Sequence, residues 1–244
     1  MAAPRRLGVT EGYDAWAPTY NADGNPLIAV EEACGAVRSV AVAGRTVLDI
    51  GTGTGRNVLP LLDRGAAAVV GIDGSAGMLR RARAAVEHYD GPGRVAATMV
   101  HHDLLKTPWP LPPSKYDVVL CSLVLEHLLP RQLPRFFGEV ARVCRRGGTF
   151  LMTVQHPGLN ASATTARFSD PAGGQVVVGD VPSNRASDYI AAGLEVGFTL
   201  TAMGEHGPSD FEGLSDRVPR AKKYVGVLTV LVLCFVRGGP LAKL

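Results

Sequence analysis

The spacing of apolar residues along the chain changes between two patterns, and each pattern predicts one kind of element. From residue 27 to residue 41 the apolar positions step by three and four, which predicts a helix with one apolar face. Further helices are expected over 56–64, 75–88 and 133–144. Short β-branched runs predict strands over 45–50, 67–72, 94–100, 116–123 and 149–155. Strands that alternate with helices indicate a doubly wound α/β fold with a parallel sheet.

The last third of the chain departs from this alternation. A helix over 187–194 and strands over 198–203 and 224–236 are expected, and only a loop separates the two strands. They are therefore predicted to pair antiparallel at one edge of the sheet. Before them, two short β-prone runs, 166–168 and 175–178, surround a Gly/Pro-rich turn and predict a hairpin.

This hairpin lies in a segment rich in small and polar residues that leaves the predicted sheet after its fifth strand. A loop of this length inside a compact domain is usually functional. We therefore expect 157–190 to form an inserted cap over the acceptor pocket, with Arg167 or Phe168 facing the acceptor.

Length and composition narrow the class of protein. A chain of 244 residues with 46% hydrophobic and 19% charged residues can build one domain over 1–244 with a sizeable core. The net charge of +3 is too small to indicate a nucleic-acid partner, and the basic run 217–223 is expected to be a solvated loop.

The cysteines and the apolar runs bear on location. Four scattered cysteines without a C-x-x-C pair fit a reducing cytosol and argue against a zinc site. The first residues lack the apolar stretch of a secretory signal, and the longest apolar run, 225–236, is too short to span a bilayer. The sequence thus predicts a cytoplasmic monomer or homodimer that binds no membrane.

The sequence V-L-D-I-G-T-G-T-G over 47–55 is a strand followed by three glycines and a helix. Glycines at such a turn let a ligand approach the backbone, and the helix start offers free N–H groups. The G-x-G-x-G spacing differs from the dinucleotide fingerprint G-x-G-x-x-G, which argues against a nicotinamide oxidoreductase.

Three carboxylates follow three successive predicted strands. Asp49 and Asp73 end the first two strands, and Asp103 comes just after the third. Ligands bind at this edge of open α/β sheets. An acidic residue at the end of the second strand is placed to hold the two hydroxyls of a ribose, and Asp103 can accept from an adenine amino group.

On these residues the chain resembles the class I S-adenosylmethionine-dependent methyltransferases of the small-molecule type. The matching stretches are 47–55, V-V-G-I-D-G-S over 69–75, H-H-D-L-L over 101–105, Y-D-V-V-L-C-S-L-V-L-E-H-L over 116–128 and E-V-A-R-V-C-R-R-G-G-T-F over 139–150. The segment 13–20 with Asn25-Pro26 looks like the lid helix of that group, within N-terminal lid helices expected over 11–42. The resemblance implies a seven-stranded sheet with an antiparallel last strand.

The resemblance also assigns roles to residues. Asp49 and the glycines would hold the methionine end of S-adenosylmethionine, Asp73 the ribose, and Asp103 the adenine amino group. Met78 would pack on adenine and Tyr20 would close over the methionine moiety. Thr52 stands where the family often has cysteine or alanine. The full expected cofactor set is Tyr20, Asp49, Gly51, Thr52, Gly53, Gly55, Asp73, Gly74, Met78, Asp103, Leu104 and Ser122.

Two histidines are candidates for a general base. His127 follows the fourth strand and His156 ends the fifth, so both are expected at the ligand-binding edge. An unperturbed histidine pKa near 6.5 suits a base at neutral pH. The histidines show no close H-x-x-x-H pairing, so no metal is expected. Trp16 and Trp109 are either walls of a substrate pocket or core residues.

The function predicted is the transfer of a methyl group to a small molecule, including acceptors of secondary metabolism. The alternative is a methyltransferase-like cyclase that binds the cofactor without methyl transfer, because the binding motif is the same in both. A third reading, a catalytically inactive partner subunit, predicts a cofactor motif that has lost its key residues. The motif in this sequence keeps them.

Overall fold

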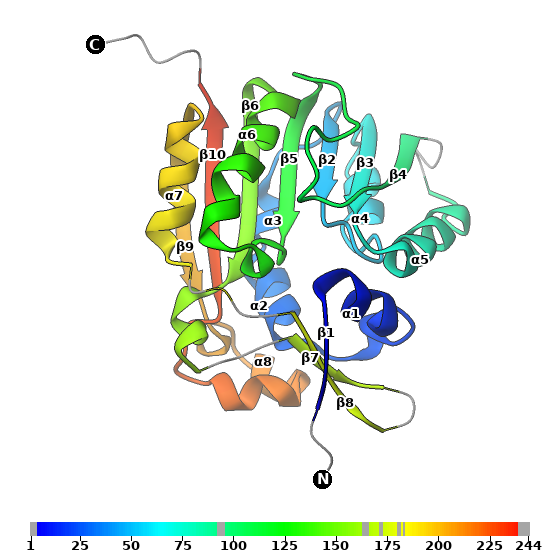
Figure 1. Cartoon of the computed structure of the whole chain (residues 1–244), viewed down its shortest axis with the longest axis vertical. Coiled ribbons are helices and arrows are strands. Elements are labelled where there is room, and N and C mark those ends of the chain that lie inside the picture. Colours follow the sequence, from blue (N-terminus) through cyan, green and yellow to red (C-terminus); the bar gives the residue numbers. More distant parts are fainter. Residues whose placement is uncertain are drawn as a thin grey trace.

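The computed structural model describes residues 4–91, 96–162, 166–170, 173–179, 182 and 184–238, and it contains two sheets (Figure 1). The larger sheet has seven strands in the order β4-β3-β2-β5-β6-β10-β9. Its strands are β2 (Thr46–Ile50), β3 (Ala68–Asp73), β4 (Ala97–His101), β5 (Tyr116–Ser122), β6 (Cys144–Gln155), β9 (Phe198–His206) and β10 (Val230–Arg237). Strand β10 runs antiparallel to both of its neighbours, and the pairs from β4 to β6 are parallel. The predicted fold class is therefore confirmed.

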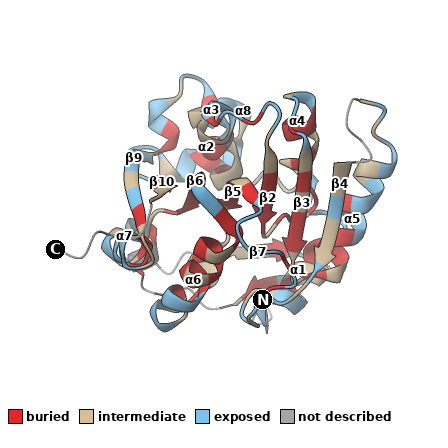
Figure 2. Ribbon diagram, turned by 90° about the horizontal axis from the view of Figure 1, so that it is seen from above, coloured by how far each residue is buried: buried red, intermediate tan, exposed pale blue. Residues whose placement is uncertain are grey.

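Helices cover both faces of this sheet. On one face, α3 (Ala36–Ser39), α4 (Val58–Asp63) and α5 (Ala76–Glu87) pack on the first strands. On the other, α6 (Leu133–Val143) and α7 (Ala186–Glu195) pack on aromatic side chains of β6, β9 and β10. The central strands are almost wholly buried, as Figure 2 shows in red, because parallel strands covered by helices on both faces must be apolar on both sides.

A smaller three-stranded sheet lies below the carboxyl edge of the large one in the view of Figure 1. It joins the hairpin of β7 (Ala166–Ser169) and β8 (Gln175–Val178) to β1 (Arg5–Leu7), which pairs parallel to β8. The hairpin is confirmed, whereas β1 is an element that the sequence pattern does not reveal. Since β1 leads directly into α1 (Val9–Trp16), the inserted hairpin and the N-terminal helix form one layer.

The remaining elements connect these layers. They are η1 (Tyr20–Ala22), α2 (Pro26–Cys34), η3 (Leu125–His127), η4 (Pro130–Gln132), η5 (Pro157–Ser162), η6 (Pro208–Asp210), α8 (Leu214–Arg217) and η7 (Pro219–Tyr224). The single helix expected over 27–41 is wrong: Gly35 adopts a left-handed conformation with φ of 70° and separates α2 from α3.

The last strand and the basic run also differ from expectation. Strand β10 begins at Val230 because residues 219–224 form a turn of 3₁₀ helix. The run 217–223 therefore belongs to α8 and η7 rather than to a loop, and Arg220 pairs with Asp23 near the N-terminal helices. The strand expected over 94–100 begins at Ala97, and residues 92–95 lie outside the described residues.

Candidate cofactor site

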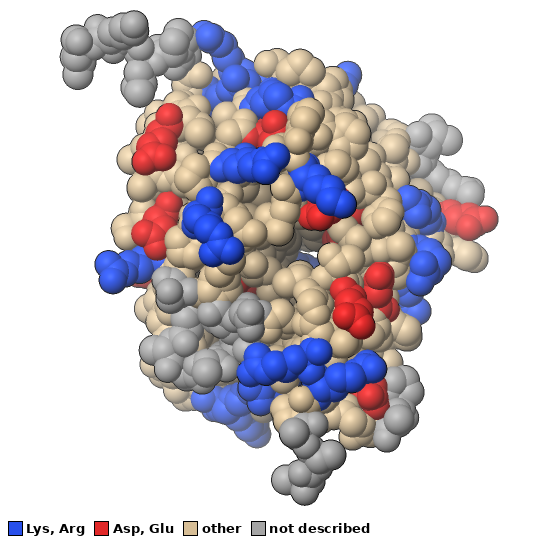
Figure 3. Space-filling view, viewed as in Figure 1, with Lys and Arg blue, Asp and Glu red and all other residues tan. Residues whose placement is uncertain are grey.

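An open cavity lies at the carboxyl ends of β2, β3 and β5, beneath α1. Figure 3 shows the molecule from the same side as Figure 1. Its surface is hollowed near the middle and carries interspersed acidic and basic side chains. Ten of the predicted site residues line the cavity. They are Tyr20, Gly51, Gly53, Asp73, Gly74, Met78, Asp103, Leu104, Ser122 and His127.

The glycine turn after β2 forms the inner wall of this cavity. Gly51, Gly53 and Gly55 have φ values of 65°, 56° and 80°, a region that favours glycine. A Cβ atom on Gly51 would lie 2.2 Å from Cγ2 of Val124, which also lines the cavity. Gly55 lies outside the cavity, where a Cβ would lie 3.1 Å from that of Ala82 and so obstruct the packing of the turn on α5.

The carboxylate of Asp73 faces the cavity and is held from two sides. One oxygen, Oδ2, accepts from the N–H of Gly53 at 2.8 Å, and Oδ1 accepts from the N–H of Ser75 at 2.7 Å. Burial raises the pKa of Asp73, and these two N–H groups oppose that rise. Each oxygen keeps a second lone pair, so the carboxylate can accept two further hydrogen bonds from a vicinal diol.

Asp49 lies directly behind the glycine turn and does not line the cavity. Its Oδ2 accepts from Oγ1 of Thr52 at 2.7 Å, whereas Oδ1 is buried without a hydrogen-bond partner among the described residues. Burial raises its pKa to about 6. Thr52, expected as a ligand contact, serves instead to orient this carboxylate. An unpaired buried oxygen at this place fits a donor such as an ammonium group.

A polar network ties α2 to the same edge of the sheet. The buried carboxylate of Glu31 pairs with Arg56 at 2.5 Å and accepts from Oγ of Ser122 at 2.5 Å, and Thr153 also donates to it. Arg56 in turn donates to Oγ of Ser122 at 2.8 Å. Ser122, a cavity residue, is therefore held in one orientation by a buried ion pair.

Hydrogen bonds from polar residues of helix α1 hold this helix over the cavity. Oδ1 of Asp14 accepts from Oγ of Ser75 and from the N–H of Gly77, both at 2.6 Å. The hydroxyl of Tyr13 lies 2.9 Å from Nε2 of His127. Because Ser75 and Gly77 begin α5, the carboxylate of Asp14 lies at the positive end of that helix and holds α1 above the side of the cavity that Asp73 lines.

His127 is placed at the cavity by a strained turn. Leu123, the residue after β5, has φ of 55°, a conformation that costs about 1–2 kcal/mol for a non-glycine residue. The chain then forms η3, which carries His127. Burial lowers the pKa of His127 to about 4, well below the ordinary value that made it a candidate base. The imidazole is thus neutral at physiological pH.

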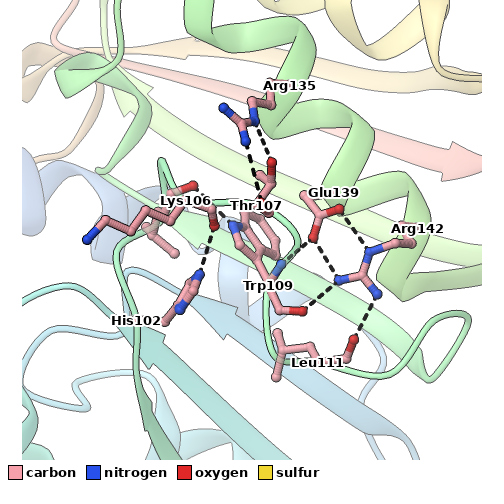
Figure 4. A network of polar contacts seen from close by, with 9 residues as sticks. His102, Lys106, Thr107, Trp109, Leu111, Arg135, Glu139 and Arg142 are labelled. Carbon is pink, nitrogen blue, oxygen red and sulfur yellow. Dashed lines mark hydrogen bonds and ion pairs between the residues drawn. The ribbon is translucent and has the colours of Figure 1, made fainter.

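The opposite wall of the cavity is a loop anchored on α6 (Figure 4). The N–H of Trp109 donates to Glu139 at 2.7 Å, and Arg142 bonds Glu139 and the carbonyls of Trp109 and Leu111. Nε1 of Trp109 donates to the carbonyl of Leu104 at 3.0 Å. Trp109 is therefore a buried anchor for the cavity residues Asp103 and Leu104 and not a wall of a substrate pocket.

Three further candidate residues lie away from the cavity. His156 does not line the cavity; its Nε2 lies 2.9 Å from Glu205 and its Nδ1 accepts from the N–H of Gly158. Trp16 and Phe168 do not face the cavity either. Their rings stack on each other with centroids 5.1 Å apart and form the core between α1 and the hairpin. Both side chains therefore belong to this small core, which is the alternative left open for Trp16.

Several cavity residues escape sequence reasoning. They are Val9, Thr10, Tyr13, Ser75, Leu105, Leu123, Val124 and Leu128. Tyr13 belongs to the segment 13–20 that resembles a lid helix, so the sequence could have predicted its place at the cavity. No sequence pattern indicates that Leu123 and Val124 line the cavity, because their exposure there comes from the left-handed backbone conformation of Leu123.

Comparison with known proteins agrees with this geometry. Residues 47–148 match the family described as a methyltransferase domain. Over 222 residues the chain is 30% identical to an uncharacterized methyltransferase of Emericella nidulans, covering 79% of this chain and 76% of that protein. The chain belongs to the methyltransferase family.

Solved structures share the fold of this methyltransferase. An S-adenosylmethionine dependent methyltransferase from Mesorhizobium loti superposes with a TM-score of 0.65 at 24% identity, over 83% of this chain and 96% of the other. The [4+2]-cyclase SpnF superposes with a TM-score of 0.65 at 17% identity, over 97% and 99%. Both likenesses extend beyond the 47–148 match to nearly the whole of each solved chain.

Two searches of the described residues give negative results. No helix in this part of the methyltransferase is both long and apolar enough to cross a membrane. Nor do three or more His, Cys, Asp or Glu side chains gather there in an arrangement that could hold a metal ion.

Proposed function

We propose that this methyltransferase uses S-adenosylmethionine and transfers its methyl group to a small-molecule acceptor. The observation that carries the proposal is the position of Asp73, whose two oxygens face a cavity bounded by the glycine turn on one side and by Met78 and Asp103 on the other. The nucleoside of S-adenosylmethionine would fit beside Asp73, Met78 and Asp103, and its charged methionine tail would fit along the glycine turn.

The residues present fit the cofactor at each end. Asp73 would hold the ribose hydroxyls, Met78 and Leu104 would sandwich the adenine, and Asp103 would accept from its amino group. The tail would lie along Gly51 and Gly53, toward the unpaired oxygen of Asp49 and the fixed hydroxyl of Ser122. When bound, the cofactor supplies a sulfonium whose methyl group is already activated for transfer.

The chain's own contribution is therefore alignment and the exclusion of water. The latch of Asp14 on α5 and the contact of Tyr13 with His127 hold α1 across the cavity, while apolar side chains such as Val9 and Leu105 line it. Positioning of this kind can supply roughly 7 kcal/mol of barrier lowering. We propose the segment 157–190 as a cap over the acceptor, because its hairpin packs on α1 through Trp16 and Phe168.

His127 is the remaining candidate for a direct role at the acceptor, and the structure alters what that role can be. In the neutral tautomer that carries its proton on Nδ1, Nε2 accepts from the hydroxyl of Tyr13. Tyr13 must turn away before Nε2 can accept a proton from an acceptor. We propose His127 as a residue that orients the acceptor side through this hydrogen bond.

Calorimetry with S-adenosylmethionine, S-adenosylhomocysteine and NAD tests the cofactor. Micromolar binding of both sulfur compounds and far weaker binding of NAD is expected. Incubation with methyl-tritiated cofactor and fractions of a cell extract then tests the reaction. Label appearing in a small molecule supports methyl transfer, whereas binding with conversion of an unlabelled substrate supports the cyclase alternative.

A further inference from the structure

The contact between Tyr13 and His127 lies in a part of the cavity wall that the cofactor groups leave open. Val124 borders the glycine turn, because a Cβ on Gly51 would lie 2.2 Å from its Cγ2 atom. His127 lies one turn further along the chain, and its N–H donates to the carbonyl of Val124 at 3.0 Å. Both residues line the cavity. The imidazole of His127 is therefore close to the turn along which the tail of the cofactor is proposed to lie.

This part of the wall carries no charge. Among the described lining residues the acids are Asp73 and Asp103, at the nucleoside end, and neither lysine nor arginine is present. Much of the remaining lining is apolar and consists of Val9, Leu105, Leu123, Val124 and Leu128. A charged acceptor would lose its hydration here without gaining a counterion, whereas an uncharged apolar molecule is stabilised by burial.

The polar pair in this wall matches a hydroxyl group. The hydroxyl of Tyr13 lies 2.9 Å from Nε2 of His127. In the tautomer that carries its proton on Nδ1, Nε2 offers a lone pair and the hydroxyl of Tyr13 offers a proton. A group that enters between the two must therefore donate to one and accept from the other. A hydroxyl does both through one oxygen, whereas an ammonium group has no lone pair and a carboxylate has no proton.

From this arrangement we infer that the acceptor is an uncharged, largely apolar molecule whose hydroxyl group binds between Tyr13 and Nε2 of His127 and is methylated there. The inference rests on the proposed function and names the substrate class of the same site. The hydroxyl oxygen forms the new bond to the methyl carbon with a lone pair, and the electron pair of the carbon–sulfur bond stays on sulfur. The proton of the hydroxyl goes to Nε2, and the product is a methyl ether.

The surroundings of His127 suit this step. Burial lowers its pKa to about 4, so the ring enters the step neutral and with a free lone pair once Tyr13 has moved aside. The oxygen becomes strongly acidic as its bond to carbon forms, so even a weakly basic imidazole can take the proton. Gly179, which follows β8, lies beside the ring, because a Cβ there would lie 3.9 Å from Nδ1 and 2.8 Å from Cγ2 of Val9. The lid, the hairpin and η3 thus meet at the imidazole.

The chemistry of the labelled product tests the inference with the natural acceptor. The full chain is incubated with methyl-tritiated S-adenosylmethionine and fractions of a cell extract, and the labelled small molecule is recovered. It should move into an organic solvent from both acidic and alkaline water, keep its label in alkali, and release methyl iodide with hydriodic acid. An amine would stay in acidic water, a methyl ester would release methanol in alkali, and a methyl group on carbon would resist hydriodic acid.

Small probes test the binding site independently of turnover. Benzyl alcohol, benzylamine, benzoate and toluene share one ring and differ in the group that it carries. Each is titrated by calorimetry into the full chain saturated with S-adenosylhomocysteine, and phenol is added to distinguish an aromatic from an aliphatic hydroxyl. At least one of the two hydroxyl probes should bind about tenfold more tightly than benzylamine and benzoate, because neither charged probe finds a counterion in the lining.

Two variants separate the role of His127 from a structural one. H127F keeps an aromatic ring but leaves the hydroxyl without an acceptor, so the affinity for benzyl alcohol relative to toluene should fall about tenfold. H127Q offers an amide oxygen that accepts a hydrogen bond but takes no proton. It should keep much of the binding preference and lower methyl transfer by about 10²-fold or more. The matched control H88F, at the exposed end of α5, should behave as the wild type.

Three outcomes would overturn the inference while leaving the proposed function intact. The first is a labelled product that is an amine, an ester or a molecule methylated on carbon. The second is a wild-type chain that binds the charged probes as tightly as the hydroxyl probes. The third is an H127F variant that keeps the wild-type ratio between benzyl alcohol and toluene. Failure of the wild-type chain to bind either sulfur cofactor, or to label any small molecule, would instead contradict the proposed function.

Discussion

The hydroxyl of Tyr13 lies 2.9 Å from Nε2 of His127, and this contact joins helix α1 to the turn that follows strand β5. The two residues are far apart in the sequence, yet their rings also meet edge to face with centroids 5.4 Å apart. Since both line the cavity, opening of α1 must break this hydrogen bond. The state of the lid is thus coupled to the acceptor side of the site.

Replacement of Tyr13 by phenylalanine should loosen the lid. The variant keeps the ring but loses the hydrogen bond to His127, so the free energy of unfolding should fall by about 1 kcal/mol. Binding of S-adenosylhomocysteine should weaken several-fold because the open lid becomes more populated. Denaturant unfolding and calorimetry measure the two effects, with Tyr224→Phe as the control; equal affinities for wild type and Tyr13→Phe would contradict the coupling.

The depressed pKa of His127 should appear in the pH dependence of stability. In the folded chain the imidazole stays neutral down to about pH 4, whereas in the unfolded chain it takes up a proton near pH 6.5. The unfolded state therefore binds more protons between these values, and stability is lost as the pH falls through this window.

The size of this effect can be isolated with His127→Gln, which cannot titrate. Between pH 7 and pH 4 the wild type should lose about 3 kcal/mol more unfolding free energy than the variant. Unfolding by urea at several pH values measures the difference. Parallel curves for the two proteins over this range would show that His127 titrates normally in the folded chain.

Asp73→Ala should weaken cofactor binding strongly, because it removes two charge-assisted hydrogen bonds worth about 1.5–3 kcal/mol each. Asp73→Asn distinguishes the loss of these ligand hydrogen bonds from a collapse of the glycine turn. Its amide oxygen can still accept from the N–H of Gly53 or Ser75 and so support the turn. Both variants should bind S-adenosylmethionine at least tenfold more weakly by calorimetry. The exposed Asp90→Ala is the control, and an affinity within twofold of wild type would exclude Asp73 from the ribose site.

Sequence reasoning brought Asp73, Asp103 and the glycine turn to one edge of the sheet because these groups follow parallel strands, whose position follows from the order of elements. It did not foresee that His156, which follows strand β6, turns away from the cavity toward Glu205 on β9, two strands along the sheet. The alternation of elements gives the edge at which a residue stands. It does not give the side toward which its side chain points.

The lid shows the same limit. The resemblance over 13–20 indicated a lid, yet the latch of Asp14 on Ser75 and Gly77 joins residues about sixty positions apart and leaves no periodic signal. The sequence gives no signal for strand β1 either, because its three residues pair with a hairpin about 170 positions further along the chain. Contacts between segments far apart in sequence decide both features.

Asp14→Ala should release helix α1 from α5. It removes the two hydrogen bonds at the positive end of α5, which together should cost about 1–2 kcal/mol of unfolding free energy. Amide exchange in residues 9–16 should accelerate, and binding of S-adenosylhomocysteine should weaken. Exchange measured by mass spectrometry gives the first effect, and Glu11→Ala on the same helix is the control. Unchanged exchange in this helix would mean that β1 and the hairpin hold α1 without the latch.

Glu126→Gln should stabilise the free protein, with a pH dependence opposite in sign to that of His127. The folded chain keeps the Glu126 proton up to about pH 8, whereas the unfolded chain releases it near pH 4.5. The folded state thus binds more protons in this window, so the wild type loses stability as the pH rises through it. The glutamine variant lacks this loss.

The advantage of Glu126→Gln over wild type should therefore grow from pH 4.5 and level off above pH 8, reaching on the order of 3–5 kcal/mol. Urea unfolding between pH 4.5 and pH 9 measures it, and Glu87→Gln should show no such trend. Asp49, whose pKa burial raises to about 6, contributes a similar slope to both proteins and cancels in the difference. A constant difference across this range would show that the Glu126 carboxyl ionises normally when folded.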